Sequence, residues 1–316
     1  MHQASGNSLT GFTLALVTAV LWGMLPIALK VLLTELSANT ITWIRFLAAA
    51  AFITLVLYKQ RAFPKLNQLK AKGRWLLLIA VAGLLSNYIL YLQGLNLLSA
   101  ETAQVVIQLA PFLMMMGGIF IFREKLLFWQ KMGAAALVVG LLLFFNDRLW
   151  LLMTQLTQDS FGVLLVIIAA ITWAAYALAQ KQLLMHLNSQ QIMWFIYVAG
   201  SCCFMPFIEL APVFELTGVQ WALLLFCCLN TIFAYGAFAE ALEHWEASKV
   251  SAVLAITPLL TILFANLAAW IWPAAPQPQA LNFWSIFGAV LVVIGSAVTA
   301  LAPVLKQWRL DNRSTA

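Results

Sequence analysis

A stripe of polar side chains runs along one expected helix in the first half of the chain. Gln104, Gln108, Pro111 and Met115 recur at spacings of four, three and four residues, which places them on one helical face. Amide groups on such a face can replace the water around a neutral or zwitterionic solute. Alternatively, the glutamines only hydrogen-bond neighbouring helices, a contact that contributes about 0.6 kcal/mol in membranes. The stripe marks a candidate solute-binding face.

Aromatic and amide side chains extend this candidate site onto other expected helices. Tyr88 and Tyr235 hold equivalent positions in the two halves of the chain, and so do Trp22 and Trp173. Tryptophans this deep in a span, away from the headgroups, favour a cavity or gate, with structural packing as the alternative. The candidate substrate-binding residues are Trp22, Asn87, Tyr88, Tyr91, Gln104, Gln108, Trp173, Tyr176 and Tyr235.

Four residues are candidates for coupling or gating. Glu240 lies near a helix end, where burial in the bilayer would suit a proton-coupling site and hydration would make the carboxylate inert. Glu124 lies between two basic residues and is expected to pin a loop or cap a helix. Pro111 and Pro258 are equivalent in the two halves, and each removes a backbone donor within a helix. Their kinks are either hinges or static bends.

Three basic residues fall within expected helices or at their ends. Arg45 lies one turn into its helix and either attracts an anionic solute or, as we expect, reaches the headgroups or pairs with a neighbouring helix. Lys30 and Lys181 are equivalent in the two halves and are expected to extend along apolar surface towards water. These cations are too dispersed for a phosphate ester, which needs several buried cationic groups together.

The composition shows which solvent must surround the helices that carry these residues. Of 316 residues, 64% are hydrophobic and 9% are charged, whereas about a quarter of a soluble domain is charged. The charged residues cluster between long apolar runs, which excludes a soluble globular enzyme. The net charge of +6 comes with no basic patch interleaved with aromatics, so we expect no nucleic-acid partner.

Ten apolar windows of about 20 residues are each long enough to cross roughly 30 Å of hydrocarbon. We therefore expect an all-α membrane protein with ten transmembrane helices. The windows lie at residues 9–33, 38–58, 74–97, 100–122, 128–146, 161–184, 190–210, 219–242, 248–272 and 283–303.

The distribution of basic residues predicts the orientation of these helices. With both termini in the cytoplasm, 14 of the 17 Lys and Arg residues lie on the cytoplasmic side, and only Lys30, Arg45 and Arg148 do not. The opposite orientation would violate the positive-inside rule. We expect a multi-pass protein of the cell inner membrane with cytoplasmic N- and C-termini.

The two halves of the chain repeat each other. A shift of 151 residues superposes Trp22 on Trp173, and a shift of 155 superposes Gly133 on Gly288 and Gly140 on Gly295. Because each unit has five helices, the second unit enters the membrane from the opposite side, which is typical of alternating-access transporters. The expected divisions are a first repeat at 1–147, an external linker at 148–160, a second repeat at 161–305 and a cytoplasmic tail at 306–316.

Several local patterns match a known family in their order and spacing. They are AVLWGMLPIALK at 19–30, WIRFLAAA at 43–50, LAPFL at 109–113 and REKLLFWQKMGAAALVVGLLL at 123–143. With these patterns the chain resembles the EamA-like members of the drug/metabolite transporter superfamily over nearly its whole length. The resemblance implies two inverted five-helix repeats around a cavity lined by helices 1, 3, 4, 6, 8 and 9, with helices 5 and 10 peripheral.

One segment departs from the pattern of that family. The second repeat lacks a glutamate equivalent to Glu124 and instead carries WPAAPQPQALNF at 272–283. This Pro-rich insertion argues against a gating role for the loop.

The sequence and the resemblance together favour a secondary active transporter. We expect an exporter or exchanger of a small neutral or zwitterionic metabolite, such as an amino acid, that works by alternating access through a central cavity. The alternatives are a nucleotide-sugar or phosphate-ester exchanger, a channel and an intramembrane enzyme. A self-contained inverted repeat favours a carrier over a channel, and the three histidines form no catalytic motif.

The expected partners follow from the same hypothesis. They are a small-molecule substrate and the lipid bilayer, with proton coupling as an open alternative. We expect no cofactor, no metal site and no enzymatic activity, because the sequence carries no nucleotide-binding or metal-ligand motif. A monomer is expected, and a dimer is the alternative.

Overall fold

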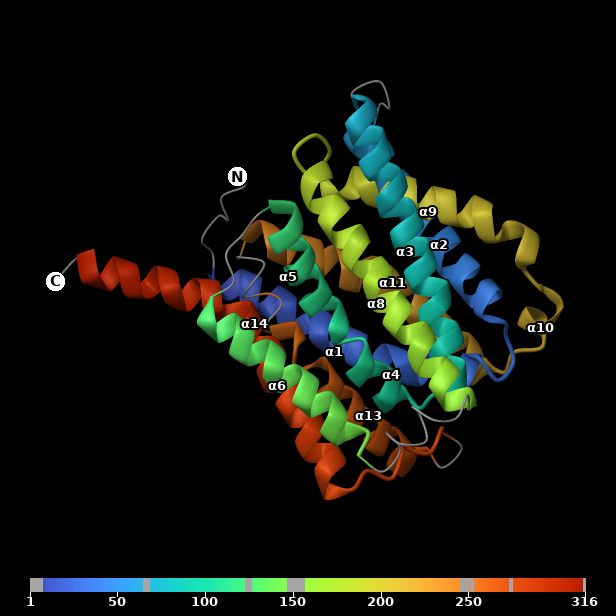
Figure 1. The fold of residues 1–316 in the computed structure, drawn as a ribbon. Coiled ribbons are helices and arrows are strands. Elements are labelled where there is room, and N and C mark those ends of the chain that lie inside the picture. Colours follow the sequence, from blue (N-terminus) through green and yellow to red (C-terminus); the bar gives the residue numbers. More distant parts are fainter. Residues whose placement is uncertain are drawn as a thin grey trace.

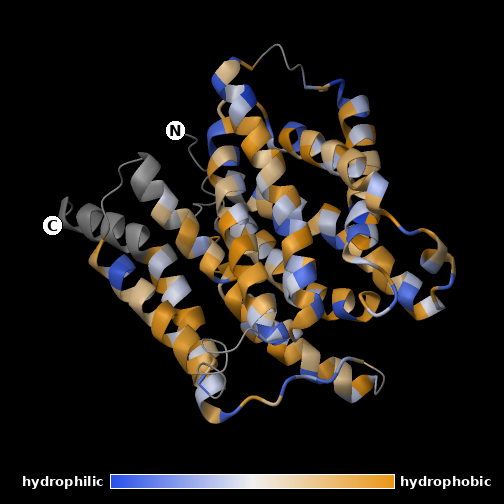
Figure 2. Cartoon of the chain, turned by 45° about the vertical axis from the view of Figure 1, so that its right-hand side comes forward, coloured by the Kyte–Doolittle hydropathy of each residue, from blue (hydrophilic) through white to orange (hydrophobic). Residues whose placement is uncertain are grey.

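The computed structural model describes residues 8–64, 69–122, 127–146, 157–244, 250, 253–272 and 275–314. Within these ranges the chain is a bundle of helices and contains no strand (Figure 1). Hydrophobic residues cover the helices along most of their length, and hydrophilic residues gather near their ends and connections (Figure 2). The expected all-α membrane architecture is confirmed.

The first half contains five membrane segments, of which the fourth is made of two helices. Its helices are α1 (Ser8–Leu32), α2 (Ala38–Gln60), α3 (Ala71–Leu97), α4 (Ala100–Val106), α5 (Leu109–Phe122) and α6 (Phe128–Phe144).

The second half has the same order of segments. Its helices are α8 (Gln158–Leu183), α9 (Ser189–Phe204) with the 3₁₀ turn η2 (Met205–Phe207), the short α10 (Ala211–Phe214), α11 (Gly218–His244), α13 (Thr257–Ile271) and α14 (Phe283–Ser314). Among the described residues, five helices are long and apolar enough to cross a membrane, namely α1, α2, α3, α8 and α11.

Polar residues at the connections determine where several helices begin. Ser37, Ser99 and Thr157 cap α2, α4 and α8, because each side-chain oxygen accepts a hydrogen bond from a backbone N–H three residues later. Asn188 caps α9 in the same way and completes a capping box with Gln191. These contacts satisfy backbone donors that hydrocarbon would leave without partners.

The two halves are intertwined, because the main packing partner of most long helices belongs to the other half. α1 packs on α11 and α3 packs on α8, while α2 packs on α9 and α6 packs on α14. The sequence repeat relates α1 to α8 and α3 to α11, so exchanging the halves turns the first pair into the second. In the remaining two pairs, α2 with α9 and α6 with α14, the exchange swaps the two members of the pair with each other. The bundle therefore has an internal pseudo-two-fold axis.

Four glycines hold α6 and α14 together at the edge of the bundle, where the two helices lie side by side (Figure 1). A Cβ atom on Gly133 would lie 2.6 Å from the carbonyl oxygen of Gly295, and one on Gly140 would lie 2.8 Å from that of Gly288. The two contacts are equivalent under the pseudo-two-fold axis. Close backbone approach through small residues is a common way of packing helices in membranes.

The fourth segment, expected as one helix, is interrupted at Ile107 and Gln108. The N–H of Gln108 bonds to the carbonyl of Val105 rather than to that of the residue four positions earlier. Pro111 has no N–H for the carbonyl of Ile107, which instead accepts from Ala110 at 2.9 Å. The proline thus accounts for the break between α4 and α5.

The ninth segment has a matching break before Pro258, and its regular helix α13 begins at Thr257 rather than at the expected residue 248. Residues 245–249, 251 and 252 lie outside the described residues. Pro258 frees the carbonyl of Leu254, which accepts the hydroxyl of Thr257 at 2.6 Å. Both halves therefore break their fourth helix at equivalent positions and satisfy the freed carbonyl locally.

The bundle has two ends. We call the end at which α1 begins and α14 ends the terminal side, and it also carries the α2–α3 and α8–α9 connections. The opposite end, the distal side, carries residues 33–37, 98–99, 205–217 and 275–282.

Replacing Gly140 with alanine is expected to destabilise the protein by about 1–3 kcal/mol, because the new Cβ would press on the backbone of α14 and separate the two helices. The measurement is the midpoint of thermal unfolding in detergent. Gly236→Ala in α11 is the matched control, since a Cβ atom on Gly236 would meet no other side chain or helix within 4 Å. An equal effect of both changes would show that helix propensity, and not close packing, governs Gly140.

Candidate functional site

A cavity of about 140 Å³ lies where helices of both halves meet. Its walls come from α1, α2, α3, the α4–α5 segment, α8, α11 and α13. These include all six of the segments that the resemblance implies, and α2 is added through a single residue, Arg45. The volume is smaller than the roughly 300–1,000 Å³ of sites for drug-sized ligands. The cavity therefore has the dimensions for a small solute.

The structure brings together eight of the nine residues that the sequence suggests for substrate binding. They are Trp22, Asn87, Tyr88, Tyr91, Gln104, Gln108, Trp173 and Tyr235. Gln104, Gln108 and Pro111 of the predicted stripe line the cavity, with Ile107 beside them, while the side chain of Met115 lies outside what the structure describes.

Tyr176 is the exception and does not line the cavity. Its side chain is 1% exposed and packs in a core formed with α2, α3 and α9. The hydroxyl lies 3.5 Å from the sulfur of Met193. Tyr176 lies one helical turn after Trp173, and its ring meets the Trp173 ring edge to face with centroids 6.3 Å apart, so it packs behind a residue that lines the cavity.

Aromatic rings from both halves meet at the cavity. The rings of Tyr88 and Tyr235, which are equivalent in the repeat, are stacked with centroids 6.1 Å apart. Trp22 meets Tyr235 edge to face at 5.3 Å. Such pairs contribute about 0.5–1.5 kcal/mol beyond the burial of their surface. They join α1, α3 and α11 at the pseudo-two-fold axis.

Two polar side chains of the lining are engaged within the protein. The Tyr91 hydroxyl donates to the amide oxygen of Gln104 at 2.9 Å, and the Asn87 amide donates to the carbonyl of Ala169 at 2.9 Å. Asn87 thus also ties α3 to α8.

Two other buried polar atoms of the lining are orphaned among the described residues. The Tyr88 hydroxyl and the amide oxygen of Gln108 make no hydrogen bond there. Their side chains are buried, at 4% and 6% exposed. A buried polar atom without a partner costs about 1–3 kcal/mol, so these two atoms are available to a ligand.

Arg45 ends in the cavity and is 2% exposed, so it does not reach the headgroups, whereas the expected pairing with a neighbouring helix is confirmed by its bond to Thr231 of α11. Its neighbours one helical turn away on either side, Ile41 and Ala49, are also buried, so this face of α2 points into the bundle. The guanidinium Nε donates to the Thr231 hydroxyl at 2.9 Å, and Cζ lies 4.8 Å from the centre of the Tyr88 ring.

A signal for Arg45 was present in the repeat. The shift of 151 places Arg45 on Ile196, and the shift of 147 places Gln108 on Ala255. Positions at which one half is polar and the other apolar break the internal symmetry. In the cavity the cation and the amides come from the first half, while the second half contributes Trp173, Tyr235, Leu254 and Thr257.

The four candidates for coupling or gating lie in different surroundings. Glu240 is near the end of α11 with a side chain 60% exposed, and its carboxylate is 3.9 Å from the His244 imidazole. Pro111 lines the cavity, whereas Pro258 is buried beside the break before α13. Glu124 lies outside the described residues.

Lys30 does not extend into solvent as expected but closes the distal end of α3. Its ammonium donates to the carbonyls of Leu95, Asn96 and Leu98 at 2.9, 2.9 and 2.7 Å. These carbonyls are at the C-terminal end of a helix, where a cation is favoured. Lys181, its repeat equivalent, is exposed on the terminal side.

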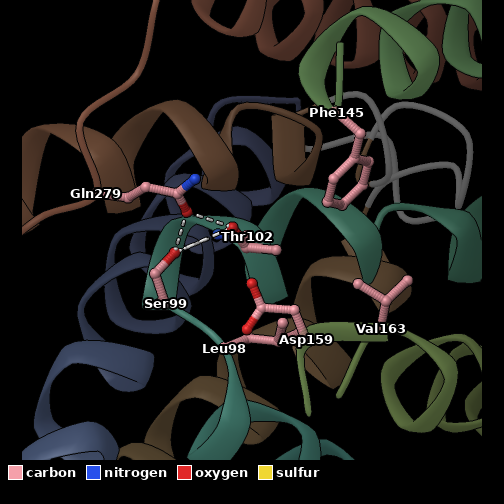
Figure 3. Close-up of a pocket in the computed structure, with 7 residues that line it drawn as sticks. All are labelled: Leu98, Ser99, Thr102, Phe145, Asp159, Val163 and Gln279. Carbon is pink, nitrogen blue, oxygen red and sulfur yellow. Dashed lines mark hydrogen bonds between the residues drawn. The ribbon is translucent and has the colours of Figure 1, made fainter. Parts of the chain in front are cut away.

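The connection between α13 and α14 folds over the distal end of α4. The amide oxygen of Gln279 accepts hydrogen bonds from the hydroxyls of Ser99 and Thr102 at 2.8 and 2.6 Å, as Figure 3 shows. The backbone N–H of Gln279 donates to the buried carboxylate of Glu101 at 3.3 Å. We call these four residues the distal latch. The Pro-rich insertion, which the sequence argues against as a gate, is thus held directly against the α4 helix that leads to the cavity.

Comparison with known proteins adds to this geometry. The model of the EamA-like transporter family matches residues 9–146 and again residues 160–301. An uncharacterized transporter of Haemophilus influenzae is 43% identical over 293 residues, which cover 93% of this chain and 95% of the relative. The uncharacterized inner membrane transporter YhbE of Escherichia coli K12 is 40% identical over 303 residues, with 95% and 93% covered.

More distant proteins cover the chain as fully. A probable amino-acid metabolite efflux pump of Escherichia coli K12 is 23% identical over 309 residues, which cover 94% of this chain and 95% of the relative. A crystal structure at 18% identity covers 95% of this chain and 99% of its own with a TM-score of 0.64, and it has the same fold. The chain belongs to the EamA-like family, a ten-helix membrane fold of two repeats, and is a membrane transporter.

Proposed function

We propose that the protein is a secondary active carrier that exports or exchanges a small neutral or zwitterionic metabolite, such as an amino acid. The observation that carries this proposal is the central cavity, which combines orphaned polar atoms with aromatic rings and is built from both halves of an inverted repeat. Polar groups that lack protein partners inside a membrane are suited to replace the hydration shell of a solute.

The chemistry of the lining supports a zwitterionic or neutral solute. Amide oxygens, a tyrosine hydroxyl and one guanidinium offer acceptors and donors together, and the rings of Trp22 and Trp173 offer apolar surface. The relative from Escherichia coli K12 that is named a probable amino-acid metabolite efflux pump supports the same class of substrate.

The lining gives no support to a phosphate-ester or nucleotide-sugar exchanger. Of the Lys and Arg residues that the structure describes, only Arg45 lines the cavity. Lys30 is engaged with three carbonyls at the end of α3, and Lys181 lies on the surface. A phosphate group is usually held by several convergent donors of positive charge.

Alternating access is the mechanism that we propose for this carrier. The distal latch joins the second half to the distal end of α4, the helix whose Gln104 lines the cavity. The matched breaks, at Ile107 and Gln108 in the first half and before Pro258 in the second, can act as hinges while the long helices keep their shape. Opening the latch would expose the cavity on the distal side, and closing it would return access to the terminal side.

We further propose that the terminal side faces the cytoplasm of a cell whose inner membrane holds the protein. Lys59, Arg61, Lys70 and Arg74 flank the α2–α3 connection on this side, in agreement with the positive-inside rule. The relative YhbE is named an inner membrane transporter. The distal side would then face outward.

Replacing Gln108 with alanine is expected to raise the KM for the transported solute about two- to tenfold, because one hydrogen bond of about 0.5–1.5 kcal/mol is lost. The measurement is saturable uptake of labelled amino acids and aromatic metabolites into proteoliposomes. Gln220→Ala, which removes an amide from the exposed start of α11, is the control and should leave uptake unchanged. Equal KM values for wild type and Gln108→Ala would remove Gln108 from the site.

Coupling to protons through Glu240 stays a prediction. The Glu240 side chain is 60% exposed, and a variant that cannot titrate at this position tests the prediction directly. If Glu240 carries the coupled proton, Glu240→Gln will abolish the response of uptake to a pH gradient, because the amide cannot titrate. Exchange of labelled for unlabelled solute at equal pH on both sides should continue. A pH response that persists in the variant would exclude Glu240 as the coupling site.

Replacing Gln279 with alanine is expected to favour the distal-open state, because two hydrogen bonds of about 0.5–1.5 kcal/mol each are lost from the closed state. Each 1.4 kcal/mol shifts the equilibrium about tenfold. The reporter is Ala110→Cys in the cavity, on a background without the four native cysteines, labelled from the distal side with an impermeant maleimide.

Gln277→Ala, in the same connection, is the control for this shift, because the Gln277 amide nitrogen donates to the carbonyl of Ala275 at 3.4 Å, outside the latch. Faster labelling with Gln279→Ala alone supports the latch as a gate. If the reporter is labelled at the same rate with the native latch, with Gln279→Ala and with Gln277→Ala, the latch is a structural contact and not a gate.

A further inference from the structure

We propose that Arg45 is the carboxylate-binding residue of the central cavity, so that the solutes carried by this protein possess a carboxylate group. This inference rests on the proposed carrier function and narrows its substrate to a chemical class. It assigns a ligand to the one cation that the structure describes in the lining.

The first reason is that Arg45 is buried without a countercharge. Its side chain is 2% exposed, and no described carboxylate lies within ion-pair distance of it. A charge held away from water is stable only when it is paired and hydrogen-bonded. The Tyr88 ring beneath the guanidinium compensates part of this charge, but a ring carries no net charge. The carboxylate of a bound solute would supply the missing partner.

The second reason is the number of donors that remain. A guanidinium has five N–H groups, and in the described part of the chain only Nε has a hydrogen-bond partner, the hydroxyl of Thr231. The two Nη groups belong to a side chain that lines the cavity and are available to an incoming acceptor. Two parallel N–H groups match the two oxygens of a carboxylate.

The third reason is that the guanidinium is held in one orientation. The Thr231 hydroxyl accepts from Nε and itself donates to the carbonyl of Cys227 at 2.9 Å, so its lone pair is directed at Arg45. Tyr88 packs against the face of the guanidinium at 4.8 Å. Contacts from α11 and α3 therefore fix a side chain of α2 before any ligand arrives, which lowers the entropy lost on binding.

The neighbouring orphaned atoms complement a carboxylate and extend the argument to an amino acid. The Tyr88 hydroxyl has a proton to donate and makes no hydrogen bond within 3.5 Å among the described residues, although the hydroxyls of Thr231 and Tyr235 lie near it, and the amide oxygen of Gln108 can accept from an ammonium group. The rings of Trp22 and Tyr235 offer an apolar surface for a side chain. An α-amino acid is a small solute that uses all of these groups at once.

A purely structural role is the competing explanation, in which Arg45 only ties α2 to α3 and α11. Such a tie would explain the bond to Thr231 and the contact with Tyr88. It would not make ligand affinity depend on whether the ligand has a carboxylate. The charge of the ligand is therefore the variable that separates the two roles.

The experiment measures the affinities of two matched ligand series by thermal shift of the purified full-length protein. The leucine series is L-leucine, 4-methylvalerate, L-leucinamide and isoamylamine, and the phenylalanine series is L-phenylalanine, 3-phenylpropanoate, L-phenylalaninamide and 2-phenylethylamine. Each series keeps its side chain while the carboxylate and the ammonium are removed in turn. Stabilisation reports binding to the folded state.

The wild type is expected to bind the carboxylate members of at least one series about tenfold more tightly than the amide and the amine, as charge-assisted hydrogen bonds predict. Arg45→Gln should reduce this preference to about twofold or less, and Arg45→Lys should give an intermediate value because lysine lacks the planar pair of donors. Arg74→Gln is the matched control, since the Arg74 side chain bonds to the carbonyl of Leu69 at the start of α3.

Several outcomes would overturn the inference. They are equal binding of acid and amide by the wild type, a preference for the amine, no stabilisation by any carboxylate, or a preference that survives in Arg45→Gln. If Arg45→Gln fails to fold, the comparison of acid, amide and amine binding by the wild type still tests the inference. Uptake of the same probes into proteoliposomes separates the two proposals. Saturable flux that ignores the carboxylate would refute the role of Arg45 and leave the carrier, whereas carboxylate-selective binding without flux would refute the carrier alone.

Discussion

In hydrocarbon every buried polar group must find its partner inside the protein, and this constraint organises the whole bundle. Helices satisfy most backbone groups, and capping residues such as Ser99 satisfy their first turns. Where Pro258 frees a carbonyl, the hydroxyl of Thr257 occupies it, and Lys30 covers the carbonyls at the end of α3. Among the described residues, buried side-chain oxygens of Thr42, Asn230 and Thr299 also lack a partner, but those of Tyr88 and Gln108 belong to residues that line the cavity, where a solute can supply one.

The helix packing follows the pseudo-two-fold axis, whereas several polar residues of the cavity depart from it. Glycines at equivalent positions hold α6 against α14, and equivalent tyrosines stack between α3 and α11. A symmetric cavity would offer the same groups on both walls. Instead, Arg45 and Gln108 have apolar counterparts at Ile196 and Ala255, so the cation and the amides of the lining all come from the first half. In the proposed carrier, this asymmetry would favour one orientation of a bound solute although the scaffold is nearly symmetric.

The sequence predicts the ten segments and most of the lining, because hydropathy and helical spacing are local signals. Gln104 and Gln108 face the cavity as their four-residue spacing indicates. The position of Tyr176 could not be predicted, since it depends on which way α8 faces α9. The depth of Arg45 along α2 suggests reach to the headgroups, whereas packing of α2 turns that face inward. The distal latch joins residues nearly 180 positions apart and has no local signature.

The paired helices α6 and α14 have a consequence for how the protein sits in its membrane. Phe128 and Trp129 are exposed at the terminal end of α6, and their repeat equivalents Phe283 and Trp284 are exposed at the distal end of α14. Aromatic side chains of this kind anchor at the two interfaces of a bilayer. The glycine contacts hold these two helices together as one unit with aromatic side chains at each membrane surface. In the proposed alternating-access cycle, this unit would keep its depth in the bilayer while other helices tilt, so that the surrounding lipid need not thicken or thin.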